Sequence, residues 1–260
     1  MDKQIIISCI ERTAPLSIAA EWDHSGIQVP CLRNQVTKLA VTLDPTPDSI
    51  ARALASGADM ILTHHPLTLS PRFTHDEDSY VSCLRQLLSA DVMLYSSHTS
   101  LDANPNGPAS WFAMALGITS PSVLESTGSM PDSGIEAGFG LVGNIPQTSL
   151  AHILALTGCS DARLCGGHTP IPETIHRIAV CPGSGSSLAE EAAKQGAQLF
   201  VTGDMKYHAA LDAPLPILDV GHFSLENTMI QRFGEQISQE LPGLDVIFVP
   251  AVDPFTPIHA

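Results

Sequence analysis

The sequence predicts an α/β protein made of two similar halves with mostly parallel sheets. β-rich and helical segments alternate along the 260 residues, and the second half repeats the first. Residues 39–41 and 57–63 match residues 178–180 and 196–202 with a constant shift of 139 positions. Strands in such units are parallel and joined by right-handed crossovers, and ligands collect beyond their carboxyl ends.

Apolar runs and turn residues place the individual elements. In the first half we expect helices 2–13, 47–56 and 79–90, a helix from 106–108 to about 117, and strands 38–43, 60–63 and 92–95. Residues 119–137, rich in Ser, Pro and Gly, are predicted to be a linker. In the second half we expect strands 138–143, 178–180, 199–202 and 217–220 and helix 147–157. The predicted domains are 1–118 and 138–260.

Composition argues against several functional classes. Apolar residues make up 44% and charged residues 15% of the chain, as in an ordered globular protein. The net charge of −15 repels phosphate backbones, so no nucleic-acid partner is expected. The six cysteines lack Cys-x-x-Cys spacing and fit buried apolar positions in a reducing compartment. Without a secretory leader or an apolar run that spans a bilayer, the expectation is a cytoplasmic protein with no membrane partner.

Metal-binding residue types recur at three predicted strand ends. Strand 60–63 precedes a His-His pair, and two later strands precede a histidine followed, four residues on, by a carboxylate. These residues are His64, His65, His98, Asp102, His222 and Glu226. Imidazole and carboxylate together suit Fe, Zn, Mn, Ni or Co, and a carboxylate can bridge two ions. The sequence therefore predicts a site for two divalent metal ions, at the strand ends between the two domains.

The expected ligands are His64, His65, Asp102, His222 and Glu226, with Glu226 or Asp102 as the bridge. His98 is a sixth ligand, an orienting residue or the catalytic general acid or base. Adjacent side chains at a strand end point to opposite sides, so His64 and His65 can address two ions, or one ion and a substrate. The spacing of four places each later histidine and its acid on one helical face.

A second polar segment occupies the repeat position of residues 63–65. It runs over residues 202–208 and contains Asp204, Lys206 and His208 as candidate substrate-facing groups. The alternative is a helix N-terminus, with Asp204 as its cap.

Taken together, these segments resemble the Nif-three-like dinuclear-metal proteins, commonly named GTP cyclohydrolase 1 type 2 homologues. The matching segments are residues 21–29, 62–67, 97–102, 138–140, 202–208 and 221–226. One departure is His24-Ser25-Gly26, where the family usually has Asn-Val-Gly. The resemblance implies two interlinked α/β domains, a homohexamer, and a metal pair held by residues matching the five expected ligands.

Two main functions follow as expectations. The first is a dinuclear-metal-dependent hydrolase whose small-molecule substrate is a purine nucleotide or a related cyclic amide, although the few basic residues argue against a triphosphate. The alternative is a non-catalytic protein that binds and delivers metal or acts as a scaffold. A regulatory interaction partner is a third possibility that no sequence feature distinguishes.

Overall fold

The computed structural model describes residues 1–159, 161–166 and 170–256, so the end of the predicted second domain, residues 257–260, is not covered. The residues form two compact units, which are described separately. Among the described residues, unit 1 comprises Met1–Leu101 and Met229–Val252, and unit 2 comprises those of Asp102–Thr228 and residues 253–256. The chain thus leaves unit 1 and later returns to it, and these boundaries replace the predicted division after residue 118.

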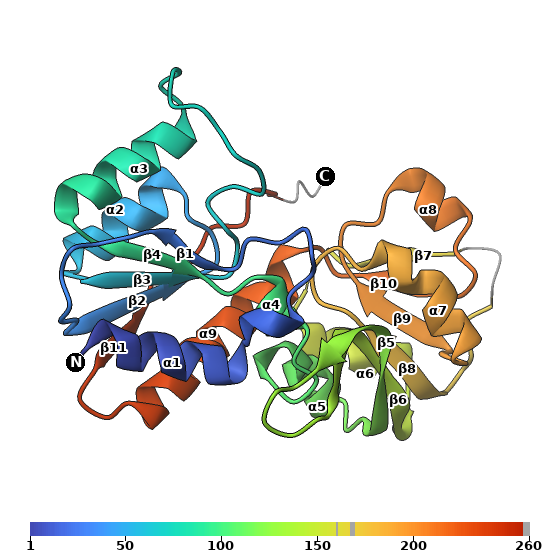
Figure 1. The fold of residues 1–260 in the computed structure, drawn as a ribbon. Helices are drawn as coiled ribbons and strands as arrows, with labels where there is room; N and C mark the ends of the chain where they lie inside the picture. The colour runs from blue at the N-terminus through green and yellow to red at the C-terminus, as the bar shows by residue number, and fades with distance from the viewer. Residues whose placement is uncertain (160, 167–169, 257–260) are drawn as a thin grey trace. The chain divides into compact units, whose positions relative to one another are not determined.

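Unit 1 contains a five-stranded sheet in the order β1-β4-β3-β2-β11. Its strands are β1 (Gly26–Val29), β2 (Lys38–Thr42), β3 (Met60–Thr63), β4 (Met93–Ser96) and β11 (Asp245–Phe248). β1 is antiparallel to β4, and the other pairs are parallel. Helices α2 (Pro47–Ala55) and α3 (Ser79–Ala90) cover one face of this sheet, and α1 (Lys3–Thr13) and α9 (Phe223–Glu240) lie on the other (Figure 1).

Local chemistry explains where α2 begins and ends. Thr46 and Ser49 form a reciprocal capping box, and Pro47 occupies the first turn, where its missing N–H costs nothing. The helix is followed by Gly57 at φ +83°, a left-handed position that glycine adopts without strain. Its buried face packs on β2 and β3 through Ile50 and Ala53.

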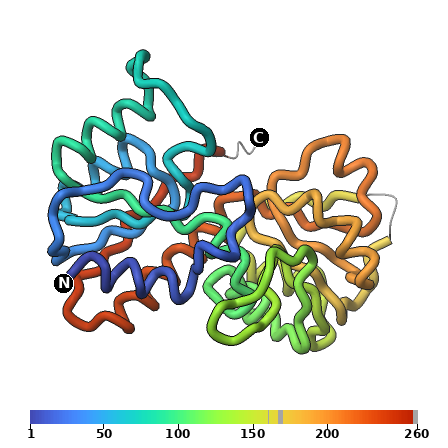
Figure 2. The backbone as a smooth tube through the Cα atoms, in the orientation of Figure 1, coloured from blue at the N-terminus to red at the C-terminus, as the bar shows by residue number. Residues whose placement is uncertain are grey.

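The returning C-terminal segment is tied to the first helix, as the red and blue parts of the trace in Figure 2 show. Arg12 forms an ion pair of 2.8 Å with Glu240, and the Cys9 thiol donates to the same carboxylate at 3.4 Å. Gln236 donates to the Thr13 hydroxyl at 2.8 Å. Burial and the neighbouring Glu240 together raise the pKa of the Cys9 thiol to about 11, so this cysteine is a neutral packing group.

Unit 2 contains a six-stranded sheet in the order β5-β6-β8-β9-β10-β7. Its strands are β5 (Thr119–Ser129), β6 (Glu136–Thr148), β7 (Arg163–Cys165), β8 (Ile175–Val180), β9 (Leu199–Thr202) and β10 (Ile217–Asp219). Strands β8, β9 and β10 are parallel, whereas β5, β6 and β7 pair antiparallel with their neighbours. The α/β class with parallel strands at the centre of both sheets is confirmed, and the antiparallel strands flank that centre in unit 2.

The shorter helices complete the chain. They are η1 (Leu16–Ile18), α4 (Thr99–Asp102), η2 (Pro108–Ser110), α5 (Trp111–Ala115), α6 (Leu150–Thr157), η3 (Ser186–Leu188), α7 (Ala189–Lys194) and α8 (Tyr207–Leu211). Within the residues that the structure describes, no helix is both long enough and apolar enough to cross a membrane.

The predicted linker over residues 119–137 is wrong. Most of it is strand β5, which pairs with β6 from Thr119 to Ser129 and extends the sheet of unit 2. Its Ser-rich sequence reflects exposure, because most β5 side chains face solvent and only Val123 and Leu124 are buried. Ser, Gly and Pro therefore mark an exposed strand here and not a break between domains.

The internal repeat is confirmed at the level of strand register. In unit 1, Leu39 pairs with Met60, and in unit 2 Ile178 pairs with Leu199, each 139 positions later. The match extends to the crossover, since helix α2 corresponds to residues 186–194, which form η3 and α7. The two strand–helix–strand units therefore share one order of elements and one strand register, and they position candidate site residues at equivalent strand ends.

Candidate metal centre

The His-His pair of unit 1 lies directly beyond β3, on a backbone fixed from several sides. The amides of His64 and His65 both donate to the Leu43 carbonyl, at 3.2 and 3.1 Å. Their own carbonyls accept hydroxyl hydrogen bonds, from Ser96 to His64 and from Thr63 to His65, each 2.7 Å long. The backbone that carries the two rings is therefore fixed by the sheet, which limits the entropy lost on binding a ligand.

The expectation that these two side chains point to opposite sides is wrong. Their ring centroids lie 4.8 Å apart, and His98 joins them with centroid distances of 5.3 and 5.7 Å. The reason is that β3 ends at Thr63, so strand alternation no longer applies to residues 64 and 65. We call His64, His65 and His98 the histidine trio.

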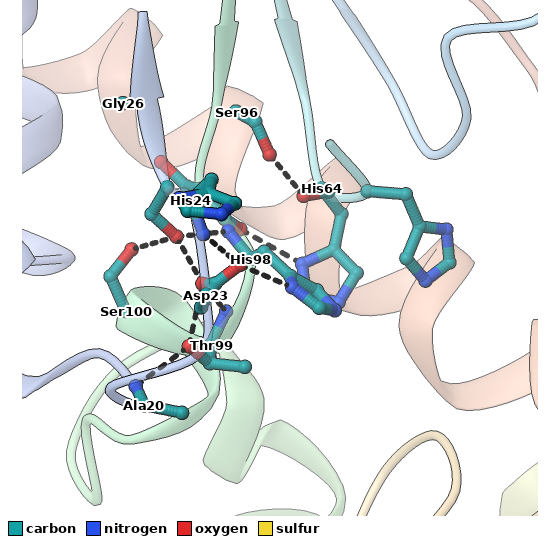
Figure 3. A network of polar contacts seen from close by, with 12 residues as sticks. Ala20, Asp23, His24, Gly26, His64, Ser96, His98, Thr99 and Ser100 are labelled. Atoms are coloured by element: carbon teal, nitrogen blue, oxygen red, sulfur yellow. Dashed lines mark hydrogen bonds and ion pairs between the residues drawn. The ribbon is translucent and has the colours of Figure 1, made fainter. Parts of the chain in front are cut away.

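His98 is held by a buried carboxylate that the sequence analysis assigned no role. Its Nδ1 lies 2.9 Å from Oδ1 of Asp23, whose side chain is fully buried. The other oxygen of Asp23 accepts bonds from Ser25 Oγ and from the amide and hydroxyl of Thr99 (Figure 3). Burial alone would raise the pKa of Asp23, but the hydrogen bonds from His98, Thr99 and Ser25 outweigh it and hold the pKa far below its ordinary value.

All three histidines of the trio share one pattern of hydrogen bonding. The Nδ1 atoms of His64, His65 and His98 lie 2.9, 2.7 and 2.9 Å from Ser97 O, Asp44 Oδ1 and Asp23 Oδ1. Carbonyl and ionised carboxylate oxygens only accept, so each Nδ1 carries the proton and each Nε2 is the basic nitrogen. Metal-binding histidines are oriented in this way by oxygen partners.

The trio is also compact enough for a common ion. Each ring offers one nitrogen, and these three nitrogens lie within 4.8 Å of one another. His64 is completely buried, whereas the side chains of His65 and His98 are 22% and 14% exposed, so the cluster is open to a small molecule on one side. The donor type and burial fit a divalent transition-metal ion.

Unit 2 holds its histidine in a comparable way. His222 Nδ1 lies 2.7 Å from Asp204 Oδ2, and His222 Nε2 lies 2.9 Å from Glu226 Oε2. Glu226 is buried in the first turn of α9, and the predicted i,i+4 pairing with His222 is thus observed. A Cβ on Gly183 would come within 2.1 Å of Glu226 Oε1, so the glycine makes room for this carboxylate.

The loops that carry this pair are fixed by another buried acid. Asp219 is 1% exposed, accepts from the amides of Met205 and Gly221, and forms an ion pair with Arg163. Those two amides lie next to Asp204 and His222 in the chain. Asp219 therefore fixes the backbone next to Asp204 and next to His222 through these two amides.

The remaining predicted residues are placed as follows. Asp102 ends helix α4 and lines a small pocket of unit 2 with Asn104, Gly140 and Pro182. Lys206 and His208 are exposed at the start of α8. The alternative role of Asp204 as a helix cap is wrong, because the cap residue of α8 is Lys206. Asp204 is the partner of His222 instead.

Sequence reasoning missed Asp23 and Asp44 as partners of the trio, and Asp219 as a support. A usable signal existed for two of them: Asp44 lies two residues beyond the end of β2, and Asp219 ends β10, so both acids lie at or just past the carboxyl ends of parallel strands. Asp23 precedes β1 in a loop, and its burial against α4 depends on tertiary contacts that no local pattern shows.

Comparison with known proteins places this architecture in a family. The family model of Duf34/NIF3 (NGG1p interacting factor 3) matches residues 1–254. The chain is 31% identical to a GTP cyclohydrolase 1 type 2 homolog of Clostridium perfringens, an alignment covering 96% of this chain and 97% of the relative. It is 28% identical to NIF3-like protein 1 of Drosophila melanogaster, over 95% of this chain and 86% of that protein.

Solved structures agree with this assignment. Reduced HcgD from Methanocaldococcus jannaschii superimposes with a TM-score of 0.83 at 28% identity, over 96% of this chain and 98% of the other. A Bacillus cereus protein related to NIF3 superimposes with a TM-score of 0.86 at 22% identity over 99% of both chains, which shows a shared fold. The chain therefore belongs to the Duf34/NIF3 family.

Proposed function

We propose that this protein is a dinuclear-metal-dependent hydrolase that opens or cleaves a small cyclic substrate, such as a purine derivative or a cyclic amide. The observation that supports it most directly is the shared Nδ1 pattern of the histidine trio, which leaves Nε2 of His64 and His65 for metal and Nε2 of His98 for proton transfer. The relatives named GTP cyclohydrolase 1 type 2 homologs favour a purine as the first substrate to test.

The proposed ligands of two Fe, Zn, Mn, Ni or Co ions are His64, His65, Asp102, His222 and Glu226. Bound divalent ions supply Lewis acidity and lower the pKa of a coordinated water. His98 is the proposed catalytic base: Asp23 fixes its Nδ1–H, so its Nε2 accepts a proton, and the buried carboxylate stabilises the resulting imidazolium. The assembly we propose is a homo-oligomer, a hexamer by family resemblance, which light scattering of the purified chain tests.

Two substitutions separate metal binding from catalysis. We expect Glu226→Gln to lower the metal content measured by elemental analysis while the fold stays near wild type. We expect His98→Gln to retain metal and lower kcat by about 100-fold on a substrate that wild type turns over. His75→Gln is the matched control, because His75 is a surface histidine with a side chain 71% exposed.

The substrate panel contains GTP, guanosine, cyclic amides and phosphoesters, each offered to freshly metallated protein. Absence of product from every compound would refute the hydrolase and favour the non-catalytic alternative, for which transfer of metal to an apo-acceptor is the measurement. Full metal occupancy in Glu226→Gln would contradict the ligand assignment.

A further inference from the structure

An exposed tryptophan stands beside the histidine trio. Trp22 is 58% exposed, and its ring contacts that of His98 edge to face, with centroids 5.9 Å apart and an interplanar angle of 71°. The other tryptophan of the chain is treated differently, since Trp111 is 8% exposed and its indole N–H donates to the Leu225 carbonyl. Trp22 thus presents an exposed aromatic surface directly beside His98, where the ring of a ligand can pack.

The turn that carries Trp22 is fixed on both sides of the residue. Before it, the Ala20 amide donates to the Thr99 hydroxyl at 3.0 Å (Figure 3). After it, the Asp23 amide donates to the Ala20 carbonyl at 2.9 Å, and the Asp23 carboxylate is bound by His98 and Thr99. An aromatic ring on a fixed turn needs little ordering when a ligand stacks on it.

The position of Trp22 relative to His98 defines what can bind. The Trp22 ring centroid lies 5.9 Å from that of His98, so a planar ring stacked on the indole lies close to the His98 side chain. The charged groups that hold or precede this region are Glu21, Asp23 and Asp44, all acidic. Their charge favours a neutral or cationic ring, and the chain's net charge of −15, which two bound divalent ions would reduce to −11, disfavours a chain of phosphates.

We propose that Trp22 is the stacking platform that selects a planar heteroaromatic ring lacking a polyphosphate as the ligand of this site. Stacking is tolerant of ring substituents but requires a flat π-surface, so saturated rings of similar size are discriminated against. The proposal deepens the proposed hydrolase function and rests on it for the role of His98. Trp22 itself acts in binding, which can be measured without turnover.

The experiment measures equilibrium binding of three probes to the metal-loaded full-length protein by calorimetry. The probes are guanosine, which is planar, dihydrouridine, whose base is saturated, and GTP, which adds the triphosphate. Guanosine is expected to bind at least about tenfold more tightly than dihydrouridine and more tightly than GTP. Equal binding of guanosine and dihydrouridine overturns the proposal, and tighter binding of GTP overturns the exclusion of phosphates.

Three variants test the residue. Trp22→Phe keeps an aromatic face and should bind guanosine within about threefold of wild type, whereas Trp22→Leu should bind it about tenfold more weakly. Phe73→Leu is the matched control, because Phe73 is 87% exposed and its ring centroid lies 6.3 Å from that of His75, a histidine outside the trio. Unchanged guanosine affinity in Trp22→Leu, or no guanosine binding to wild type, refutes the platform.

Metal content separates this proposal from the proposed function. Trp22→Leu should contain as much metal as wild type, and a loss of metal would show that Trp22 has a structural role instead. Protein that holds no metal but binds guanosine through Trp22 would refute the dinuclear hydrolase and keep the platform. Conversely, if the metal-loaded protein is active but Trp22→Leu binds guanosine as tightly as wild type, the platform is refuted and the proposed hydrolase is kept.

Discussion

The ends of β3 and β9 occupy equivalent places in the two units and carry different chemistry. With the shift of 139 positions, His64 and His65 of unit 1 correspond to Gly203 and Asp204 of unit 2. Unit 1 therefore presents two imidazoles directly beyond its strand. Unit 2 presents an acid there and takes its histidine, His222, from beyond the next strand, β10.

The reason for the difference is steric. A Cβ on Gly203 would lie 2.4 Å from the Gly221 carbonyl oxygen and 2.8 Å from the His222 amide nitrogen. The close approach of these two strand ends is what brings Asp204 to His222. A repeated backbone has thus been adapted to hold nitrogen donors in one unit and an acid–histidine–acid arrangement in the other.

The most severe test of this comparison is Gly203→Ala. Because the clashing atoms are backbone, we expect the free energy of unfolding to fall by about 3 kcal/mol in urea denaturation. The control is Gly57→Ala, where φ is +83° but no atom lies within 4 Å of the added Cβ, so only about 1 kcal/mol of backbone strain is expected. Equal losses in the two variants would show that the strand ends do not approach closely.

The second test asks whether the two histidine–acid pairs serve the same purpose. Asp44 holds His65 in unit 1 and Asp204 holds His222 in unit 2, both at 2.7 Å. Each Asp→Ala substitution is expected to weaken metal binding by about 10- to 100-fold, measured by competition with a chelating dye, because the imidazole loses its orienting partner. Asp48→Ala, which removes an exposed partner of Arg52, should leave the affinity unchanged.

The outcome has a direct meaning for the comparison. Loss of affinity in Asp44→Ala alone would show that metal binding does not depend on Asp204 as a partner of His222, and that the two pairs serve different purposes. Wild-type affinity in both variants would contradict the role that we assign to the Nδ1 partners.

The parts of the fold that follow from local pattern were predictable from the sequence. Helix α3 agrees with the predicted 79–90, and strands β3 and β9 agree with 60–63 and 199–202, because apolar runs and flanking turn residues coincide there. Strand β5 was missed because only two of its eleven residues are buried, so it lacks an apolar signal. The residues at which the chain returns to unit 1 were also not predicted, since they depend on contacts such as Arg12–Glu240.

The candidate site divides in the same way. Histidines and acids with a repeated spacing were visible as residue types, and the structure brings His64 to His65 and His222 to Glu226. What spacing cannot show is which atom of a ring carries a proton. That information comes from Asp23, Asp44 and the Ser97 carbonyl, whose positions are set by tertiary structure.

A smaller difference between the units lies at the opposite ends of the same strands. In unit 1, the Asp59 carboxylate accepts from the amides of Thr37 and Lys38. At the equivalent place in unit 2, Gln198 Oε1 accepts from the amides of His176 and Arg177. The same two hydrogen bonds are therefore made by a charged group in one unit and a neutral amide in the other.

This difference predicts that the stabilisation contributed by Asp59 depends on pH, whereas that contributed by Gln198 does not. Burial alone would raise the pKa of Asp59, but hydrogen bonds from Thr37 and Lys38 and the charge of Arg33 outweigh it and lower the pKa below its ordinary 3.8. A lowered folded-state pKa contributes stability that is present above the ordinary value and is lost as pH falls through the folded value. The stabilisation from Asp59 is thus complete at neutral pH and disappears in acid.

Asp59→Asn replaces the carboxylate of unit 1 with a neutral amide, as Gln198 provides in unit 2. The variant therefore measures the effect of the Asp59 charge on stability. The amide oxygen can keep the bonds from Thr37 and Lys38, but the attraction to Arg33 is lost, so we expect unfolding at neutral pH to cost about 1 kcal/mol less than in wild type. The gap should narrow as the pH is lowered below about 4, because Asp59 of the unfolded wild-type chain then takes up a proton that the folded protein binds only at a lower pH. A gap that stays constant across this range would mean that the charge of Asp59 contributes nothing. Asp59 and Gln198 would then differ in chemistry but not in their contribution to stability. That contribution would come from the hydrogen bonds that each accepts from two backbone amides.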